Sequence, residues 1–131
     1  MPSLALPRRL ESVSSAVEAT EVAARRAGLS HTVQVRVSLA VAEAVSNAVE
    51  HGSSGDDSGN VHVAIEVERG QLIVEVCDEG SGVDAQAMEM AALPEDPFQT
   101  HGRGLYLIRV LTDQWHVDGS CLRMAFRERP E

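Results

Sequence analysis

An apolar helical pattern from Ser38 to Gly52 constrains the fold more than any other stretch of this chain. The segment reads SLAVAEAVSNAVEHG, and its apolar residues recur at helical spacing, which predicts a helix packed against a core. Glu43 and Asn47 interrupt the run. Because they lie one turn apart, their side chains share one side of the helix. A carboxylate beside a carboxamide is no stabilising ion pair, so the pattern indicates a base next to a metal ligand.

A second helical pattern precedes this one, from about residue 9 to residue 26, and Gly28 is predicted to end it. Its outer face is charged, which fits either a solvated face or a partner surface. Ser30 is the predicted N-cap of the following helix, which is expected to run to about Glu50. Residues 3–6 predict a short strand near the start of the chain.

The rest of the chain combines strand patterns with glycine-rich loops. The predicted segments, in order, are a polar loop at 53–60, strands at 61–67 and 72–77 around Gly70, helical turns within 84–92, a helix at 105–111, and two strands within 114–127 around a turn at 118–120. This order predicts an α+β fold, a two-layer α/β sandwich in which one mixed, mostly antiparallel sheet carries helices on one face. With 131 residues, the chain is expected to form a single domain over 1–131.

The chain is acidic, with a formal net charge of −9, which disfavours binding to nucleic acids or to anionic membranes. All 11 basic residues are arginine, which excludes lysine-based catalysis. The sequence contains no recognisable signal peptide and no apolar run long enough for a membrane span, so a cytoplasmic location is expected. Cys77 and Cys121 have strand-like apolar surroundings and no CxxC spacing, and free buried thiols are expected in preference to a disulfide.

Two glycine motifs stand next to predicted strands and helices. Asp78, Gly80 and Gly82 follow the strand at 72–77, and Gly102 and Gly104 open the helix at 105–111. Each motif alone is compatible with a simple turn or a tight helix entry. A glycine pair at a helix start also suits an anion, because free N–H groups and the helix dipole favour phosphate there. The chain contains neither the GK[ST] of a Walker A loop nor the fingerprint of a Rossmann fold.

In chain order, the three motifs resemble the N box, G1 box and G2 box of the GHKL family of ATP-binding domains. That family includes histidine kinases, gyrase-type topoisomerases, Hsp90-like chaperones and the anti-sigma serine kinases. Within it, the chain is most similar to the RsbW-type anti-sigma factors, through the segments EAVSNAVEHG, VCDEGSGVD, HGRGLYLIRVLTDQW and GSCLRMAF. The resemblance covers the chain almost from end to end and implies the Bergerat ATP-binding fold.

The resemblance implies a role for each motif residue. Asn47 would ligate Mg²⁺, and Glu43 would be the general base for an attacking serine hydroxyl. Asp78 would accept a hydrogen bond from the adenine amino group, with the Ser120 hydroxyl near the base. The other implied cofactor-binding residues are Gly80, Gly82, Gly102, Arg103, Gly104 and Leu105. His51 is expected to be structural rather than catalytic, and the histidines show no spacing typical of a zinc site.

The implied activity is that of an ATP- and Mg²⁺-dependent serine-protein kinase that is also an anti-sigma factor in a partner-switching system. Its substrate would be a STAS-domain anti-sigma-factor antagonist, its other partner a sigma factor, and its assembly a homodimer. Two alternatives remain open. One is an ATP-binding regulatory module of the same fold that acts by contact without phosphotransfer, which the presence of Glu43 disfavours. The other is a kinase in a signalling switch that involves no sigma factor.

Overall fold

The chain passes through a short strand, two long helices, and then strand pairs separated by two shorter helices. The computed structural model describes residues 3–51, 59–80, 85–91 and 103–129, and the statements below concern these residues. The elements are β1 (Ser3–Pro7), α1 (Glu11–Arg26), α2 (His31–His51), β2 (Asn60–Glu68), β3 (Gln71–Cys77), α3 (Ala85–Met90), α4 (Arg103–Leu111), β4 (Gln114–Asp118) and β5 (Cys121–Phe126). Each predicted helix and strand is present, with small displacements at its ends.

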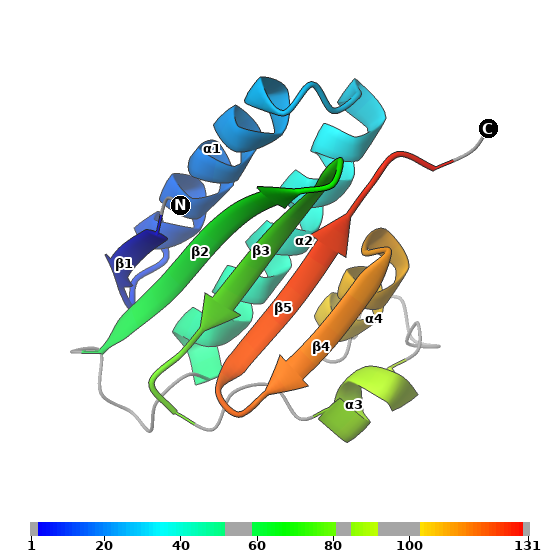
Figure 1. Ribbon diagram of the computed structural model, residues 1–131. Coiled ribbons are helices and arrows are strands. Elements are labelled where there is room, and N and C mark those ends of the chain that lie inside the picture. Colours follow the sequence, from blue (N-terminus) through cyan, green and yellow to red (C-terminus); the bar gives the residue numbers. More distant parts are fainter. Residues whose placement is uncertain (1–2, 52–58, 81–84, 92–102, 130–131) are drawn as a thin grey trace.

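The described strands form one sheet in the order β1-β2-β3-β5-β4, and each of its pairings is antiparallel. Figure 1 shows α1, α2 and α4 behind this sheet, while the face toward the viewer carries no helix. The predicted α+β sandwich with helices on one face is therefore confirmed, although the described sheet is wholly antiparallel and not mixed. None of the helices in these residues combines the length and apolarity needed to cross a bilayer.

The core lies between the helices and the covered face of the sheet. Alternation along each strand sends every second side chain toward the helices, and the helical spacing of α2 sends one apolar stripe toward the strands. The central buried residues are Val37, Val41 and Val45 of α2, Leu72, Val74 and Val76 of β3, and Leu122, Met124 and Phe126 of β5. Full burial of one such side chain contributes about 1.5–3 kcal/mol. The helix with Glu43 and Asn47 is thus anchored at the centre of the core.

The two long helices are separated by a sharp turn that ends one and begins the other. Gly28 has a φ of 77°, a conformation that favours glycine, and the N–H of Leu29 returns to the Ala24 carbonyl at 3.1 Å. The hydroxyl of Ser30 then accepts a hydrogen bond from the N–H of Val33 at 3.3 Å. The predicted helix stop at Gly28 and the predicted N-cap at Ser30 are both confirmed.

The first helix packs against the second through small side chains. Its buried residues are Ser12, Ala16, Thr20 and Ala24. Small side chains at these positions allow the two helix axes to approach closely. Glu21, on the charged face of α1, accepts a hydrogen bond from the Ser38 hydroxyl at 3.0 Å. At this position the charged face therefore contacts α2.

Arg36 of α2 is buried, with 8% of its surface exposed. Its Nη1 lies 3.0 Å from Asp113 Oδ2, and its Nη2 donates to the Arg127 carbonyl at 2.6 Å. Asp113 also accepts hydrogen bonds from the Arg129 side chain at 2.9 Å and from the Arg127 N–H at 2.8 Å. Partial burial raises the pKa of Asp113, but these hydrogen bonds lower that pKa by a larger amount. The pKa of Asp113 therefore lies below its usual value. The network fastens α2 to the ends of α4 and β5.

Cys77 and Cys121 form a disulfide, so the expectation of free thiols is wrong. The two residues are direct register partners at the end of β3 and the start of β5, and their Cα atoms are 4.0 Å apart. Side chains that face each other across antiparallel strands lie close together, which brings the two sulfurs within bonding distance. Their separation of 44 residues gives no sign of this pairing, because β5 meets β3 only through the topology of the sheet.

Candidate nucleotide-binding site

Glu43 and Asn47 lie in the C-terminal half of α2, which ends at the lower edge of the molecule in Figure 1. Both side chains are half-buried. Neither takes part in a hydrogen bond or an ion pair with any residue that the structure describes. Because buried polar groups in proteins are nearly always paired, half-buried groups without partners are available to a ligand.

Gly104, in the first turn of α4, lies against these two side chains. A Cβ atom added at Gly104 would be 2.7 Å from Glu43 Oε2 and 3.7 Å from Asn47 Oδ1. The first of these distances is too short for any residue but glycine, unless the carboxylate moves. The glycine predicted to open this helix thus allows the close approach of α4 to the base and metal-ligand candidates.

Arg103 and Leu105 stand on either side of Gly104, and both are half-buried. The first N–H groups of a helix have no acceptor within the helix, and together with the helix dipole they favour an anion. The carboxylate of Glu43 approaches this same turn. The start of α4 can therefore hold a phosphate group close to Glu43 and Asn47.

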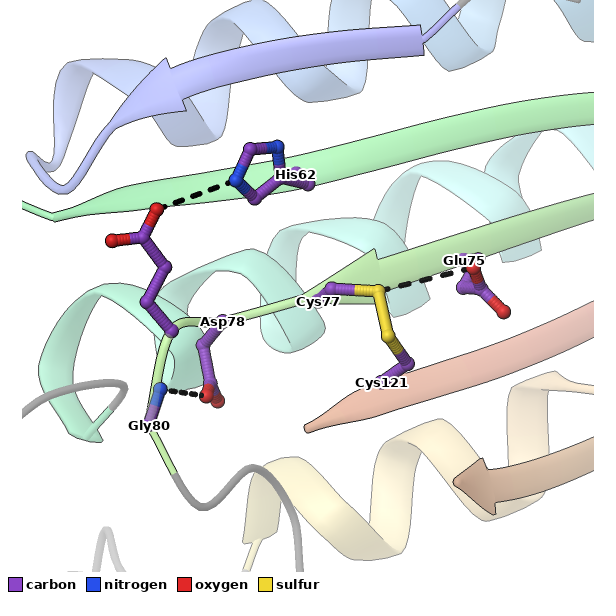
Figure 2. Close-up of a disulfide and its surroundings, with 7 residues drawn as sticks. His62, Glu75, Cys77, Asp78, Gly80 and Cys121 are labelled. Atoms are coloured by element: carbon purple, nitrogen blue, oxygen red, sulfur yellow. Dashed lines mark hydrogen bonds and ion pairs between the residues drawn. A yellow bond between two sulfur atoms is a disulfide. The ribbon is translucent and has the colours of Figure 1, made fainter. Parts of the chain in front are cut away.

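Asp78 follows the last residue of β3 and is half-buried. Its N–H donates to the Ser120 carbonyl at 3.1 Å, and its Oδ1 accepts the N–H of Gly80 at 2.7 Å (Figure 2). The second bond turns the chain immediately after the strand, as aspartate commonly does. Oδ2 makes no hydrogen bond within the described part of the chain, which leaves one carboxylate oxygen free to accept from a ligand donor.

The predicted site residues gather at one end of the fold. The C-terminal end of α2, the end of β3 and the start of β5 lie toward the lower end of the molecule in Figure 1, and Gly104 at the start of α4 lies against the C-terminal half of α2. Contacts join Gly104 to Glu43 and Asn47, and a hydrogen bond joins Asp78 to Ser120. Two other predicted residues, Gly82 and Gly102, and the side chain of His51 lie outside the described residues. Their roles stay predictions.

The sequence analysis missed one pair next to this site. The Glu79 carboxylate lies 3.4 Å from Nε2 of His62, on the neighbouring strand β2 (Figure 2). His62 is the register partner of Cys77, so only knowledge of the strand register could have linked it to the loop after β3. The pair is exposed and ionic only when the histidine is protonated, so it contributes little to stability.

Comparison with known proteins places the chain in a family. A model of the histidine kinase-like ATPase domain matches residues 6–126. Serine-protein kinase RsbW of Listeria monocytogenes serotype 4a is 32% identical over 117 residues, which cover 85% of this chain and 74% of that protein. The chain belongs to the histidine kinase-like ATPase family. The resemblance to GHKL domains of the RsbW type is confirmed, and ATP is the nucleotide that such a domain implies.

Other relatives match shorter or wider parts of the chain. Serine-protein kinase RsbW of Bacillus licheniformis is 34% identical over 101 residues, which cover 72% of this chain and 63% of that protein. Anti-sigma F factor of Clostridium beijerinckii is 31% identical over 84 residues, 63% of this chain and 59% of that protein. A solved structure of the RsbU and RsbW domains of a Mycobacterium tuberculosis protein superposes with a TM-score of 0.66 at 20% identity, a similarity of fold. It covers 99% of this chain, which spans 34% of that larger chain.

Proposed function

We propose that this chain is an ATP- and Mg²⁺-dependent serine-protein kinase and an anti-sigma factor in a partner-switching system. The family and the names of the relatives, serine-protein kinase RsbW and anti-sigma F factor, support this proposal. The structural observation that carries it is the approach of Gly104 to Glu43 and Asn47. Through this contact the candidate base Glu43 and the candidate metal ligand Asn47 lie next to the N-terminus of α4.

The donor atoms fit Mg²⁺ bound to a nucleotide. Asn47 Oδ1 and the Glu43 carboxylate are oxygen donors, and Mg²⁺ takes one or two protein ligands of this kind in addition to phosphate oxygens and waters. Gly104 leaves open the space beside them that a Cβ atom would fill. Asn47 would hold the metal through Oδ1. When bound, Mg·ATP supplies the γ-phosphoryl group and the positive charge that neutralises its oxygens.

Glu43 would accept the proton of the serine hydroxyl as that oxygen attacks. The carboxylate is suited to this step because it is half-buried and has no partner among the described residues. The N–H groups at the start of α4, with Arg103, would hold the phosphate oxygens in line with the attacking oxygen. Gly102, Gly104 and Leu105 would allow this turn to lie close to the nucleotide.

At the other side of the proposed site, Asp78 would read the base. Its free Oδ2 would accept a hydrogen bond from the exocyclic amino group of adenine, whereas guanine presents an oxygen at that position. The Ser120 hydroxyl would contact the same base, since Asp78 and Ser120 are joined through their backbones. Gly80 and Gly82 would let the backbone approach the purine ring.

The partners proposed for this chain are those that its resemblance to RsbW-type anti-sigma factors implies. The substrate would be a serine of a STAS-domain anti-sigma-factor antagonist, and phosphorylation would release that antagonist. The kinase would then hold a sigma factor, and it would act as a homodimer in the cytoplasm. The net charge of −9 is compatible with a partner that has basic regions.

A transfer assay tests the kinase proposal. The protein is incubated with labelled ATP, Mg²⁺ and the STAS-domain protein encoded nearest to it, and label on the STAS-domain protein is measured. We expect transfer by the wild type, loss of transfer in Glu43→Ala, and loss of metal-dependent ATP binding in Asn47→Ala. Absence of transfer with normal ATP binding would contradict the kinase proposal. Capture of a sigma factor in the presence of ADP or ATP tests the anti-sigma role, and no capture in either state would remove it.

The second candidate is an ATP-binding module that regulates a partner by contact alone. It keeps the contacts proposed for the adenine and the metal but has no need of a base at position 43. The two candidates differ in one result: Glu43→Gln leaves partner regulation intact in a contact module and abolishes it in a kinase. A kinase in a switch without a sigma factor would retain transfer and fail only in the capture experiment.

A further inference from the structure

The Cys77–Cys121 disulfide joins the residues adjacent in sequence to Asp78 and Ser120, which are proposed to contact adenine. Cys77 precedes Asp78 and Cys121 follows Ser120, so the bond joins the two strand ends that carry both proposed base contacts. The 3.1 Å hydrogen bond from the Asp78 N–H to the Ser120 carbonyl is the next rung of the same ladder. Because successive side chains point to opposite faces of a sheet, the sulfurs lie on one face and the Asp78 carboxylate on the other.

The disulfide is accessible to a soluble thiol. Both cysteines are partly exposed, and the adjacent Val76 and Leu122 are buried in the core, so strand alternation directs the cysteines to the face of the sheet that no helix covers in Figure 1. Their neighbours on this face are polar: Glu75 Oε1 lies 3.8 Å from Cys77 Sγ, and His62 is the register partner of Cys77 on β2 (Figure 2). Since the two cysteines are register partners, the bond can open and close while the strands stay paired.

We infer that Cys77 and Cys121 form a reversible redox site whose disulfide form binds adenine nucleotides more tightly than its dithiol form. The inference rests on the proposed function, since it takes Asp78 and Ser120 as adenine contacts. With the disulfide intact, a covalent bond and a backbone hydrogen bond hold the two strand ends together. After reduction only the hydrogen bond joins the strand ends, and it opens more often. The nucleotide then has to order Asp78 and Ser120 when it binds, which weakens its affinity.

The reductant is a dithiol. One of its thiolates attacks one sulfur of the disulfide, which breaks the Cys77–Cys121 bond and forms a mixed disulfide. Its second thiolate then displaces the cysteine, and the reductant leaves as a cyclic disulfide. Two electrons and two protons pass from the reductant to the two cysteines. The same exchange in reverse, with an oxidised dithiol as acceptor, restores the bond.

Calorimetric titration with Mg·ATP tests the inference on the full chain, first oxidised and then after reduction with dithiothreitol. A zinc-selective chelator is present, because the donor atoms of Glu75, Cys77 and Cys121 lie within 4.8 Å of one another and could capture a metal once reduced. We expect reduction to raise the Kd for ATP about fivefold and reoxidation to restore it.

The double variant Cys77→Ser with Cys121→Ser should bind ATP like the reduced protein, and dithiothreitol should not change its Kd. If that variant does not fold, Cys77→Val with Cys121→Ala replaces it.

Each result separates the inference from the function on which it rests. Equal ATP affinity of the oxidised and reduced wild type, or tighter binding after reduction, would overturn the inference and leave the proposed function intact. Absence of ATP binding in both forms, with a folded circular dichroism spectrum, would contradict the proposed function as well. Hydrogen exchange at the Asp78 N–H gives a readout independent of binding: faster exchange in the dithiol form supports the inference, and unchanged exchange removes its physical basis.

Discussion

The polar side chains in the two halves of α2 differ in their partners. In the N-terminal half, Arg36 is 8% exposed and binds the Asp113 carboxylate and the Arg127 carbonyl. In the C-terminal half, Glu43 and Asn47 are half-buried and have no hydrogen bond or ion pair in the part of the chain that is described. Arg36 holds the N-terminal half of the helix to the rest of the protein, whereas Glu43 and Asn47 in the C-terminal half have no partner among the described residues and are proposed to bind a ligand.

This difference follows from the cost of burying charge. A buried guanidinium without partners would be strongly destabilising, so Arg36 can occupy the core only because Asp113 and backbone carbonyls meet it. Glu43 is less buried, so its carboxylate can keep part of its hydration without a charged partner. The fastened half fixes the direction of the helix, and a fixed helix places Glu43 and Asn47 with little freedom.

The largest effect is expected from removing the charge of Glu43. Glu43→Gln should lower phosphotransfer by about 10²–10⁴-fold, because the proton acceptor is lost, while ATP affinity and unfolding stay close to those of the wild type. Initial rates of label transfer measure the change. The matched control is Glu18→Gln, an exposed glutamate of α1, which should transfer at the wild-type rate. A fully active Glu43→Gln protein would show that the two halves of α2 do not differ in function.

In the N-terminal half of α2, a substitution is expected to lower stability and to leave ATP binding unchanged. Arg36→Met should lower the free energy of unfolding by about 3 kcal/mol, because it removes one partner of a buried ion pair. Urea unfolding measures the loss, and Arg25→Met, at an exposed position of α1, is the matched control. At temperatures where the variant is folded, its ATP affinity should be unchanged. An unaltered urea midpoint would mean that Arg36 does not fasten the helix.

The same contrast explains how much could be predicted from the sequence. Glu43 and Asn47 are detectable because they break an apolar pattern at helical spacing, and Gly28 and Ser30 because they carry their own turn chemistry. Arg36 and Asp113 are far apart in the chain, as are Cys77 and Cys121. The first pair depends on the packing of α2 against α4, and the second on the placement of β5 beside β3. Local patterns predict elements and motif residues, whereas contacts between distant elements require the register of the sheet.

A smaller effect is expected where α4 meets the C-terminal half of α2. Gly104→Ala places a Cβ atom 2.7 Å from Glu43 Oε2, the end of a flexible side chain that can turn aside. Stability should therefore change by less than about 1 kcal/mol, while phosphotransfer falls about tenfold because the base is displaced. The double variant Glu43→Gln with Gly104→Ala should be no slower than Glu43→Gln alone. Additive losses would indicate that Gly104 acts on something other than Glu43.

The smallest expected effect is a pH dependence of the stability that Asp113 contributes through its contact with the N-terminal half of α2. The pKa of Asp113 is lower in the folded protein than in the unfolded chain, so the ionised carboxylate stabilises the fold at neutral pH. This stabilisation is lost as the pH falls from about 4, the usual pKa in the unfolded chain, through the lower pKa of the folded protein. Urea midpoints measured between neutral pH and pH 3 should therefore fall. Asp113→Asn should start from a lower midpoint and show a flatter dependence. Parallel curves for the two proteins would mean that other carboxyl groups cause the decline.

The place of β5 in the sheet has a consequence for the synthesis of this protein. β5 follows the other four strands in the chain, yet it lies between β3 and β4. Residues just after it reach back to the start of α2, where Glu128 accepts the Ser30 N–H at 2.9 Å. On the ribosome, β3 therefore has an open edge, and Arg36 lacks the Arg127 carbonyl, until residues 121–129 emerge. A polypeptide that stalls before residue 121 would present that edge to chaperones and proteases.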